Sequence, residues 1–269
     1  MPDESRSSVA APPVKSAGAR FAFVRSLERG LEIIKSFGEG CSEQTIADVA
    51  TRTGVDRATA RRFLLTLMEL GYIEQSGRMF RLSPQTLQLG YAYLSSLPWW
   101  RSAQREAERL RDRVGQNCAI GVLDRDQVVY VAYASAAPFP LVNRSLGIHL
   151  PALSTAIGRI LIAHLGDEQA RDFLHRTDIK QLTPFTLTNR DTILEVLATI
   201  RADDFAYIDQ ELELGLRSVG VPIRDRSGHV VAALSISFVG GLSSKEQIIE
   251  KHLPSLRDAT RKITELLPF

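Results

Sequence analysis

The chain has 269 residues, of which 44% are hydrophobic and 24% charged, and this composition excludes a wholly disordered protein. Lys and Arg number 33 against 31 Asp and Glu, so the net charge is +2 and any nucleic-acid site must be a local basic patch. Two cysteines, Cys41 and Cys118, are too few for a disulfide framework or a four-cysteine zinc site and fit a cytoplasmic location. No apolar run approaches the roughly 20 residues that span a bilayer, so we expect no membrane partner.

Residues 1–20 are rich in Ser, Ala and Pro, which predicts a disordered tail without the apolar centre of a signal peptide. The next segment predicts three helices and a hairpin. Helical spacing starts at residue 26, and its apolar face holds Leu27, Leu31, Ile34 and Phe37. A second helix is expected from residue 45 to Gly54, and a third from about residue 56 to 70. Two short strand-like runs then flank Ser76-Gly77, as in a β-hairpin.

Residues 45–70 carry the signal of a helix-turn-helix. Ala50 is small enough for two crossing helices, and Gly54, four residues later, tolerates the backbone angles of the turn. Apolar residues cluster on one side of the second helix of this motif, while Arg and Thr occupy the other sides, from which they can reach a major groove. The predicted DNA contacts are Thr45, Arg57, Thr59, Arg61, Arg62 and Arg78. The alternative is an ordinary amphipathic helix with a solvated basic face.

Ser83-Pro84 begins a new element, because Ser is a good N-cap and Pro is tolerated in a first helical turn. Residues 84–98 therefore predict a linker helix that Pro98 ends. Two hairpin signals follow, at 118–134 and 219–238, with single helical patterns between and after them. This mixture predicts an α+β fold with a largely antiparallel sheet. The expected domains are a tail (1–20), a winged helix-turn-helix (21–83), the linker helix (84–98) and a second domain (99–269).

Several segments resemble the IclR-type bacterial transcription regulators. The DNA-binding half of that family is similar to "SLERGLEII", "IADVATRTGVDRATARRFLLTLMELGYI" and "FRLSPQTLQLG" in this chain. Its effector-binding half is similar to "GIHLPALSTAIGRILIA", "YIDQELELGLRSVGVPIRD" and "AALSISF". Gly158-Arg159 and the DNA-binding segment look most like the branch that regulates protocatechuate and 4-hydroxybenzoate catabolism. The resemblance implies a winged helix followed by a domain that binds a small aromatic carboxylate.

The resemblance places a pocket between the sheet and the helix that begins at Ser154. Thr155 and the first amides of that helix could hold an anion at the positive end of the helix dipole. Ser235 and Ser237 are two residues apart on a strand, so both hydroxyls point to one face and need partners, of which a ligand is one candidate. The alternatives are that Thr155 only starts a helix and that the serines bond to neighbouring strands.

Further effector residues are carried over from the family pattern. Asp209 and Ser218 belong to its "D-x-E…G-L-R-[CS]" motif, and Arg144 and His149 are the nearest cationic candidates for a carboxylate. His149 stands where many members have Arg. Asp209 and Glu211 could instead be solvated or pair with Arg217, and Arg144 could be a surface or inter-subunit residue.

The chain shows no sign of catalysis. It lacks a G-x-S-x-G elbow, a P-loop, a G-x-G-x-x-G motif and any metal-ligand spacing of His and Cys, so neither enzyme activity nor a cofactor is expected. The favoured function is a ligand-responsive transcription regulator, acting as activator or repressor, of aromatic-acid catabolic genes. Its expected partners are double-stranded operator DNA, a small aromatic carboxylate and further copies of itself in a dimer or tetramer, with RNA polymerase as an additional candidate. The alternative is a constitutive DNA-binding protein whose second domain only oligomerises.

Overall fold

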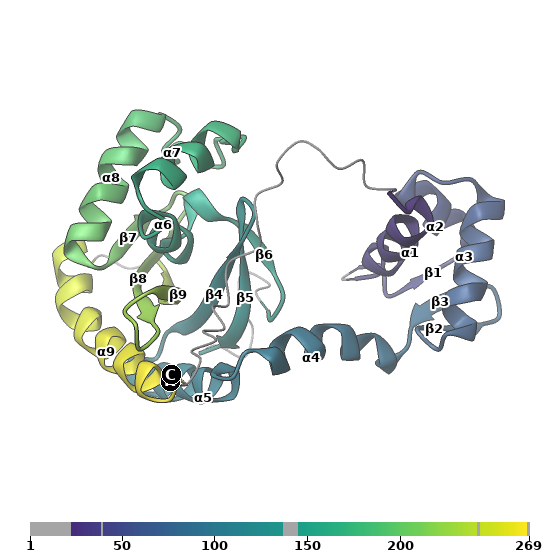
Figure 1. Ribbon diagram of the computed structural model, residues 1–269, viewed down its shortest axis with the longest axis horizontal. Coiled ribbons are helices and arrows are strands. Elements are labelled where there is room, and N and C mark those ends of the chain that lie inside the picture. The colour runs from purple at the N-terminus through teal and green to yellow at the C-terminus, as the bar shows by residue number, and fades with distance from the viewer. Residues whose placement is uncertain (1–22, 39, 137–144, 241–242, 268–269) are drawn as a thin grey trace, which may run out of the picture. The chain divides into compact units, whose positions relative to one another are not determined.

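The computed structural model describes residues 23–38, 40–136, 145–240 and 243–267 (Figure 1). Its internal contacts divide the chain into two units, the first ending at Gln88 and the second beginning at Leu89. The tail predicted for residues 1–20 and the candidate Arg144 lie outside the described residues. Among the residues described, no helix combines the length and the apolar character needed to cross a membrane.

The first unit is a three-helix core with a small antiparallel sheet. Its elements are α1 (Arg25–Ser36), β1 (Glu43–Gln44), α2 (Ile46–Thr53), α3 (Arg57–Glu69), β2 (Ile73–Ser76) and β3 (Met79–Leu82), with strand order β1-β3-β2. The predicted hairpin is therefore present, and its strand β3 also pairs with β1. Ile33, Leu64 and Phe80 are fully or almost fully buried between these elements.

The apolar face predicted for α1 is only partly buried among the described residues. Phe37 is buried, but Leu27 and Leu31 are exposed, and the residue of α1 that is completely buried is Ile33. Residues 84–98 form a 3-10 turn (Pro84–Thr86) and α4 (Leu87–Ser96), and α4 has no buried residue. Apolar side chains of α1 and α4 are therefore exposed on the part of the chain that the structure describes.

The second unit contains a six-stranded sheet in the order β6-β5-β4-β9-β8-β7, in which every neighbouring pair is antiparallel. This confirms the expected α+β fold with its antiparallel sheet. The elements are α5 (Trp100–Val114), β4 (Asn117–Asp124), β5 (Gln127–Ala134), β6 (His149–Pro151), a 3-10 turn (Ala152–Ser154), α6 (Ala156–Ala163), α7 (Asp167–Arg176), α8 (Arg190–Asp203), β7 (Ala206–Asp209), β8 (Leu216–Arg224), β9 (Val230–Val239) and α9 (Lys245–Glu265).

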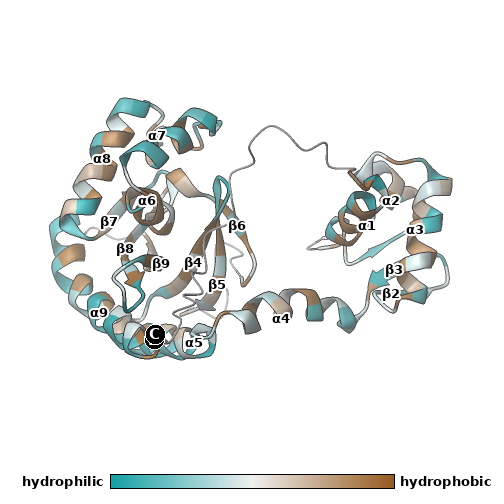
Figure 2. Ribbon diagram, viewed as in Figure 1, coloured by the Kyte–Doolittle hydropathy of each residue, from teal (hydrophilic) through white to brown (hydrophobic). Residues whose placement is uncertain are grey.

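The sheet is covered by helices on both faces (Figure 1). One core contains α5, α9 and side chains such as Ile120, Val219 and Leu234. The other contains α6, α7 and α8 against residues from β4, β5, β7 and β9. All eight residues of α6 are buried, and most of this helix has the brown colour of apolar residues in Figure 2. Because α6 lies directly on the sheet, its N-terminus is held close to the polar residues of β8 and β9.

Gly158 fixes this position of α6. A Cβ atom at Gly158 would lie 2.1 Å from the carbonyl oxygen of Ala152, on the backbone that leads into the helix. Gly220 plays a similar part on β8, where a Cβ would meet side-chain atoms of Ile160 and Ala156 at 3.0 and 3.2 Å. Gly158 thus lets α6 pack closely against the turn before it, and Gly220 lets the helix and the sheet approach more closely than a residue with a side chain would permit.

Candidate functional site

The turn between α2 and α3 has the geometry that the sequence predicts. Thr45 caps α2 in a capping box with Asp48, and Gly54 ends that helix with φ +68°, in the left-handed region. Asp56 caps α3 by accepting a hydrogen bond from the amide of Thr59 at 2.8 Å. Val49, Ala50 and Ala60 are buried where α2 and α3 meet. The second helix of the motif is therefore rigidly attached to the first and presents its opposite face to solvent.

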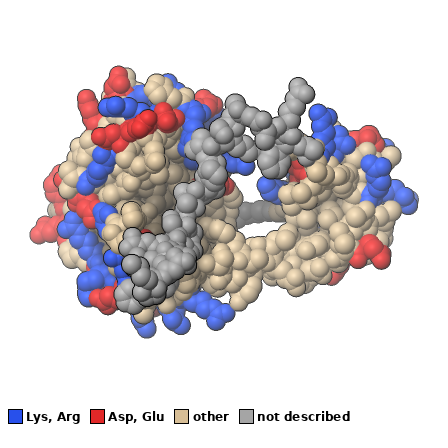
Figure 3. Space-filling view, viewed as in Figure 1, with Lys and Arg blue, Asp and Glu red and all other residues tan. Residues whose placement is uncertain are grey.

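The exposed face of α3 is basic. Ala60, Leu64 and Leu67 are buried, whereas Arg57, Arg61 and Arg62 are exposed. At 100° per residue, Arg62 lies opposite the buried side of the helix. Figure 3 shows Lys and Arg side chains gathered over the part of this unit formed by α2 and α3. The wing turn adds Arg78, which is exposed between β2 and β3, while Arg81 is paired with Glu74 at 2.8 Å.

Two of the predicted DNA-contact residues also have structural roles. The hydroxyls of Thr45 and Thr59 each donate at 2.7 Å to the carboxylate of Asp48 or Asp56. Hydrogen bonds from these threonines lower the pKa of both carboxyls. A phosphate oxygen only accepts hydrogen bonds, so it would have to displace a carboxylate to receive either hydroxyl proton. The arginines are therefore better placed than the threonines to bind a DNA backbone.

In the second unit, four of the predicted effector residues lie around one cavity. Thr155, Ser218, Ser235 and Ser237 line it together with Tyr130, Ser154, Ala156, Ile157, Ile208, Leu212 and Leu216. Ser218 faces Ser237 across the β8–β9 pair. The hydroxyls of Ser218, Ser235 and Ser237 have no hydrogen-bond partner among the described residues, although Ser235 is only 5% exposed. We call this the serine cavity.

Thr155 stands at the N-terminus of α6 and uses its hydroxyl locally. That hydroxyl accepts from the amide of Gly158 at 3.0 Å and donates to the carbonyl of Ala152 at 3.2 Å. The next residues, Ala156 and Ile157, also line the cavity, so the start of α6 forms part of its wall. The serine cavity has a volume of only about 10 Å³, which is room for about one water molecule. A larger ligand must therefore widen it.

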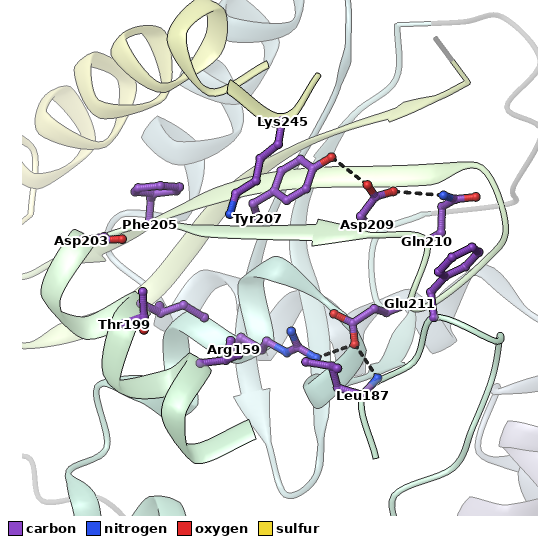
Figure 4. A pocket seen from close by; sticks show the side chains of 13 residues that line it. Arg159, Leu187, Thr199, Asp203, Phe205, Tyr207, Asp209, Gln210, Glu211 and Lys245 are labelled. Carbon is purple, nitrogen blue, oxygen red and sulfur yellow. Dashed lines mark hydrogen bonds and ion pairs between the residues drawn. The ribbon is translucent and has the colours of Figure 1, made fainter. Parts of the chain in front are cut away.

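Asp209 lies elsewhere, at a second and larger cavity of about 420 Å³ (Figure 4). Its carboxylate receives a hydrogen bond from the hydroxyl of Tyr207 at 3.1 Å and pairs with Arg217 at 3.3 Å. Burial and the nearby Asp209 raise the pKa of Tyr207 to about 12. The pairing with Arg217 matches one of the alternatives left open by the sequence. Glu211, by contrast, is buried and pairs with Arg159 at 2.5 Å.

The remaining candidates are not part of either cavity. His149 is exposed on the edge strand β6, where its ring Nδ1 is 3.0 Å from the carbonyl oxygen of Gly147 and its Nε2 is 4.0 Å from Asp124. It lines neither the serine cavity nor the cavity beside Asp209. Arg144 lies outside the described residues and stays a prediction.

Two family models match nearly the whole described chain. Residues 26–77 match the IclR helix-turn-helix domain, and residues 91–265 match the bacterial transcriptional regulator IclR C-terminal domain. The chain belongs to the IclR family of bacterial transcriptional regulators. The fold agrees with this membership, since a helix-turn-helix with a β-hairpin precedes an α+β unit with an antiparallel sheet.

Individual IclR relatives extend over the same length. The Pca regulon regulatory protein of Pseudomonas putida is 37% identical over 99% of this chain and 94% of its own length. The p-hydroxybenzoate hydroxylase transcriptional activator of Acinetobacter baylyi is 31% identical over 91% of this chain and 92% of its own. The crystal structure of an IclR homologue from Microbacterium hydrocarbonoxydans, complexed with 4-hydroxybenzoate, has the same fold, with a TM-score of 0.78 and 23% identity over 90% of this chain and 98% of that one.

Sequence reasoning missed the functional potential of Arg159. The sequence shows a single cation within the apolar run of α6, and a cation in such a run requires a buried partner. That partner, Glu211, is 52 residues away, and nothing local in the sequence connects the two. Arg159 also donates from Nε to the carbonyl of Leu153 at 2.7 Å, so it joins α6 to the turn before it and to the segment after β7.

Proposed function

We propose that this IclR-family chain regulates aromatic-acid catabolic genes and that its second unit senses a small aromatic carboxylate, such as 4-hydroxybenzoate or protocatechuate. The observation that carries the proposal is the serine cavity. Ser218, Ser235 and Ser237 line this cavity beside Thr155 and Ala156 at the start of α6, and their hydroxyls have no hydrogen-bond partner among the described residues. Ser235 is buried and Ser218 and Ser237 are half-buried. Hydroxyls in the interior normally have hydrogen-bond partners, and a ligand with a carboxylate and a ring hydroxyl would supply them.

Operator DNA would be bound by the exposed face of α3, with the turn between β2 and β3 beside it. Arg61 and Arg62 would reach base edges or phosphates in the major groove, and Arg57 and Arg78 would contact the backbone. Thr45 and Thr59 would chiefly hold the helix ends. These four arginines are exposed, and their side chains have no ion-pair partner among the described residues. This supports the assignment, because a paired cation would have to give up its partner to bind phosphate.

The ligand would enter the serine cavity by displacing the segment 210–215. Leu212 belongs to this segment, which has no regular secondary structure and connects β7 to β8. Its outward movement would enlarge a cavity that now holds about one water molecule. A ligand that binds the widened arrangement better than the closed one shifts the population toward it, and this difference in affinity is what can be transmitted to DNA binding.

The relatives support an aromatic ligand. One is named as the transcriptional activator of p-hydroxybenzoate hydroxylase, and a structural neighbour was crystallised with 4-hydroxybenzoate. The hydroxyl-lined cavity suits such a ligand, and it distinguishes the proposal from a domain that only oligomerises, since an interface needs no unpaired internal hydroxyls.

A second copy of the chain is the proposed protein partner. Leu27 on α1 is 64% exposed and Leu87 on α4 is 76% exposed, and each has further exposed apolar neighbours on its helix. Apolar surface of this extent favours association. A dimer would also present two α3 helices to an operator with two half-sites, which is how helix-turn-helix proteins commonly bind.

Calorimetric titration of the full chain tests the effector site. We expect 4-hydroxybenzoate or protocatechuate to bind and a short aliphatic keto acid not to bind. Replacing both Ser235 and Ser237 by Ala should weaken binding roughly 5- to 150-fold, since each hydrogen bond contributes about 0.5–1.5 kcal/mol. Operator affinity without ligand should be unchanged. Binding of a keto acid alone would refute the aromatic ligand, and binding of no acid would favour the constitutive alternative.

A further inference from the structure

The cavity beside Asp209 is large enough for a ligand as it stands. Its volume of about 420 Å³ lies within the range of about 300–1,000 Å³ that is usual for small-molecule sites. It is bounded by α8, β7, the segment 185–187 and the first residue of α9, and it shares no lining residue with the serine cavity. We call it the arginine cavity, because Arg159 lies at its floor (Figure 4).

Arg159 has one guanidinium nitrogen, Nη1, that makes no hydrogen bond to a described residue and faces this space. The side chain is 98% buried (2% exposed). Its Nε donates to Leu153 and its Nη2 to Glu211, but its third nitrogen, Nη1, makes no hydrogen bond to any described residue. In Figure 4 this nitrogen points into the cavity, away from Glu211. A buried N–H of a charged guanidinium needs an acceptor, so the site is incomplete without a ligand or water.

The cavity has three acidic lining residues, the exposed Asp203 as well as Asp209 and Glu211, and none of them makes a hydrogen bond to Nη1. The carboxylate of Glu211 is held by Arg159 and by the amide of Leu187 at 2.9 Å. Asp209 is bound by Tyr207 and Arg217. Burial lowers the pKa of Arg159 while Glu211 raises it, and an additional anion at Nη1 would further favour the charged guanidinium.

The walls are apolar and rich in rings. Phe185, Phe205 and Tyr207 line the cavity together with Leu187, Val196 and Ile200. At the mouth, the Nζ of the exposed Lys245 lies 5.7 Å from the centre of the Tyr207 ring. A cation at the floor, a second cation at the mouth and flat apolar walls between them suit a flat anion with one charged end.

We propose that the arginine cavity is a second ligand site of this unit, separate from the effector site proposed above, and that it takes a small monocarboxylate with an aromatic ring. The carboxylate would accept from Nη1 of Arg159 and be approached by Lys245, and the ring would pack against Phe205 and Tyr207. This occupant gives Nη1 a charge-assisted hydrogen bond and covers the apolar walls.

Titration calorimetry of the full chain with benzoate tests the site. Arg159→Lys keeps a cation for Glu211 but has no second nitrogen to aim at the cavity, so benzoate should bind at least tenfold more weakly. Thr199→Trp fills the cavity from the exposed face of α8 and should abolish this binding. Ala198→Trp, on the same helix but outside the lining, is the matched control and should bind benzoate as the unmodified chain does.

The serine variants separate this site from the effector site. The Ser235→Ala, Ser237→Ala chain should retain the benzoate binding that Thr199→Trp removes. If the melting temperature shows that Arg159→Lys does not fold, the comparison of benzoate binding by Thr199→Trp and Ala198→Trp tests the site instead. Absence of benzoate binding, or binding that only the serine variants reduce, would overturn the second site and leave the effector proposal standing. If the serine variants lose 4-hydroxybenzoate binding but still bind benzoate, the result supports two separate sites.

Discussion

Arg62 is the arginine of α3 that lies most directly opposite the buried face of that helix, and its side chain makes no hydrogen bond to another described residue. We predict that Arg62→Ala weakens operator binding roughly 5- to 150-fold, the equivalent of about 1–3 kcal/mol for one base contact. Unfolding free energy should change by less than about 0.5 kcal/mol, because the residue is exposed. Gel-shift titration and denaturant unfolding measure the two quantities.

Arg105→Ala is the control for this prediction, since it removes another exposed arginine, one that belongs to the second unit. It should leave operator affinity unchanged. Equal affinity of the Arg62→Ala and unmodified chains would show that α3 does not bind DNA through this residue.

Gly158 determines how closely α6 approaches the turn before it. We predict that Gly158→Ala lowers the unfolding free energy by about 1–3 kcal/mol, because the new Cβ would overlap backbone atoms of Ala152 that cannot move aside. Gly90→Ala in α4 is the matched control: nothing lies within 4 Å of its Cβ position, so it should stabilise by up to about 1 kcal/mol. Denaturant unfolding measures the unfolding free energy of both variants. Similar unfolding free energies for Gly158→Ala and Gly90→Ala would contradict the prediction.

His252 should make stability depend on pH. It is buried on α9 and stacked on Phe238, and burial lowers its pKa, so its proton is taken up more readily by the unfolded chain. The stabilisation that depends on neutral His252 is therefore present above about pH 6.5, the usual pKa of the unfolded chain's histidine. It is lost as the pH falls below that value toward the lower pKa of the folded chain. We predict a smaller loss of unfolding free energy between pH 7 and pH 5 for His252→Leu than for the unmodified chain. If His252→Leu and the unmodified chain lose the same unfolding free energy between pH 7 and pH 5, His252 does not cause the pH dependence.

At the level of single residues, local spacing predicts that Ser235 and Ser237 share a face, whereas the pocket itself and Ser218 come from the family resemblance, and nothing in the sequence indicates the arginine cavity. Ser235 and Ser237 share a face because they are two apart on a strand, and Thr155 was recognised as a residue at a helix start. The pairing of Arg159 with Glu211 depends on how α6 packs against a distant loop, which no local spacing encodes. The resemblance drew Asp209 into the effector set, but the structure places it beside Arg217 and Tyr207.

Among the elements, the sequence predicts the longer helices and the short strands β2 and β3 of the first hairpin, but not the short strands β1, β6 and β7. The helices α2, α3 and α9 begin at capping residues that the sequence displays. Strands β1, β6 and β7 have two to four residues, too few to show an alternating pattern, and they form through pairing with longer neighbours. The spacing of α1 identified an apolar face but could not tell which of its residues pack inside the chain and which remain exposed.

The exposed leucines of α1 and α4 carry a prediction about assembly. Leu27→Glu combined with Leu87→Glu should shift the chain from dimer to monomer in sedimentation velocity, because it places charges on apolar surface that a second copy would bury. Leu214→Glu is the control: Leu214 is similarly exposed, at 65%, but lies in the segment between β7 and β8. An unmodified chain that sediments as a monomer would refute the partner proposed for these helices.

The whole molecule joins an IclR-type helix-turn-helix to a separately packed α+β unit, so its response depends on coupling between two binding sites. Thermodynamic linkage makes that coupling reciprocal: if 4-hydroxybenzoate changes operator affinity by some factor, operator DNA must change 4-hydroxybenzoate affinity by the same factor. We predict a factor of about 5–150, which corresponds to about 1–3 kcal/mol. Its sign distinguishes an effector that promotes DNA binding from one that releases DNA.

Two titrations of the full chain measure this factor independently, one of operator with and without saturating 4-hydroxybenzoate and one of 4-hydroxybenzoate with and without saturating operator. Ser235→Ala combined with Ser237→Ala should weaken the ligand without altering operator affinity in its absence, because these serines belong to the second unit. Thr199→Trp should leave the factor unchanged if the serine cavity alone is coupled to DNA. A factor of one in both titrations, with ligand demonstrably bound, would mean that the ligand binds both arrangements of the protein equally and cannot be its effector.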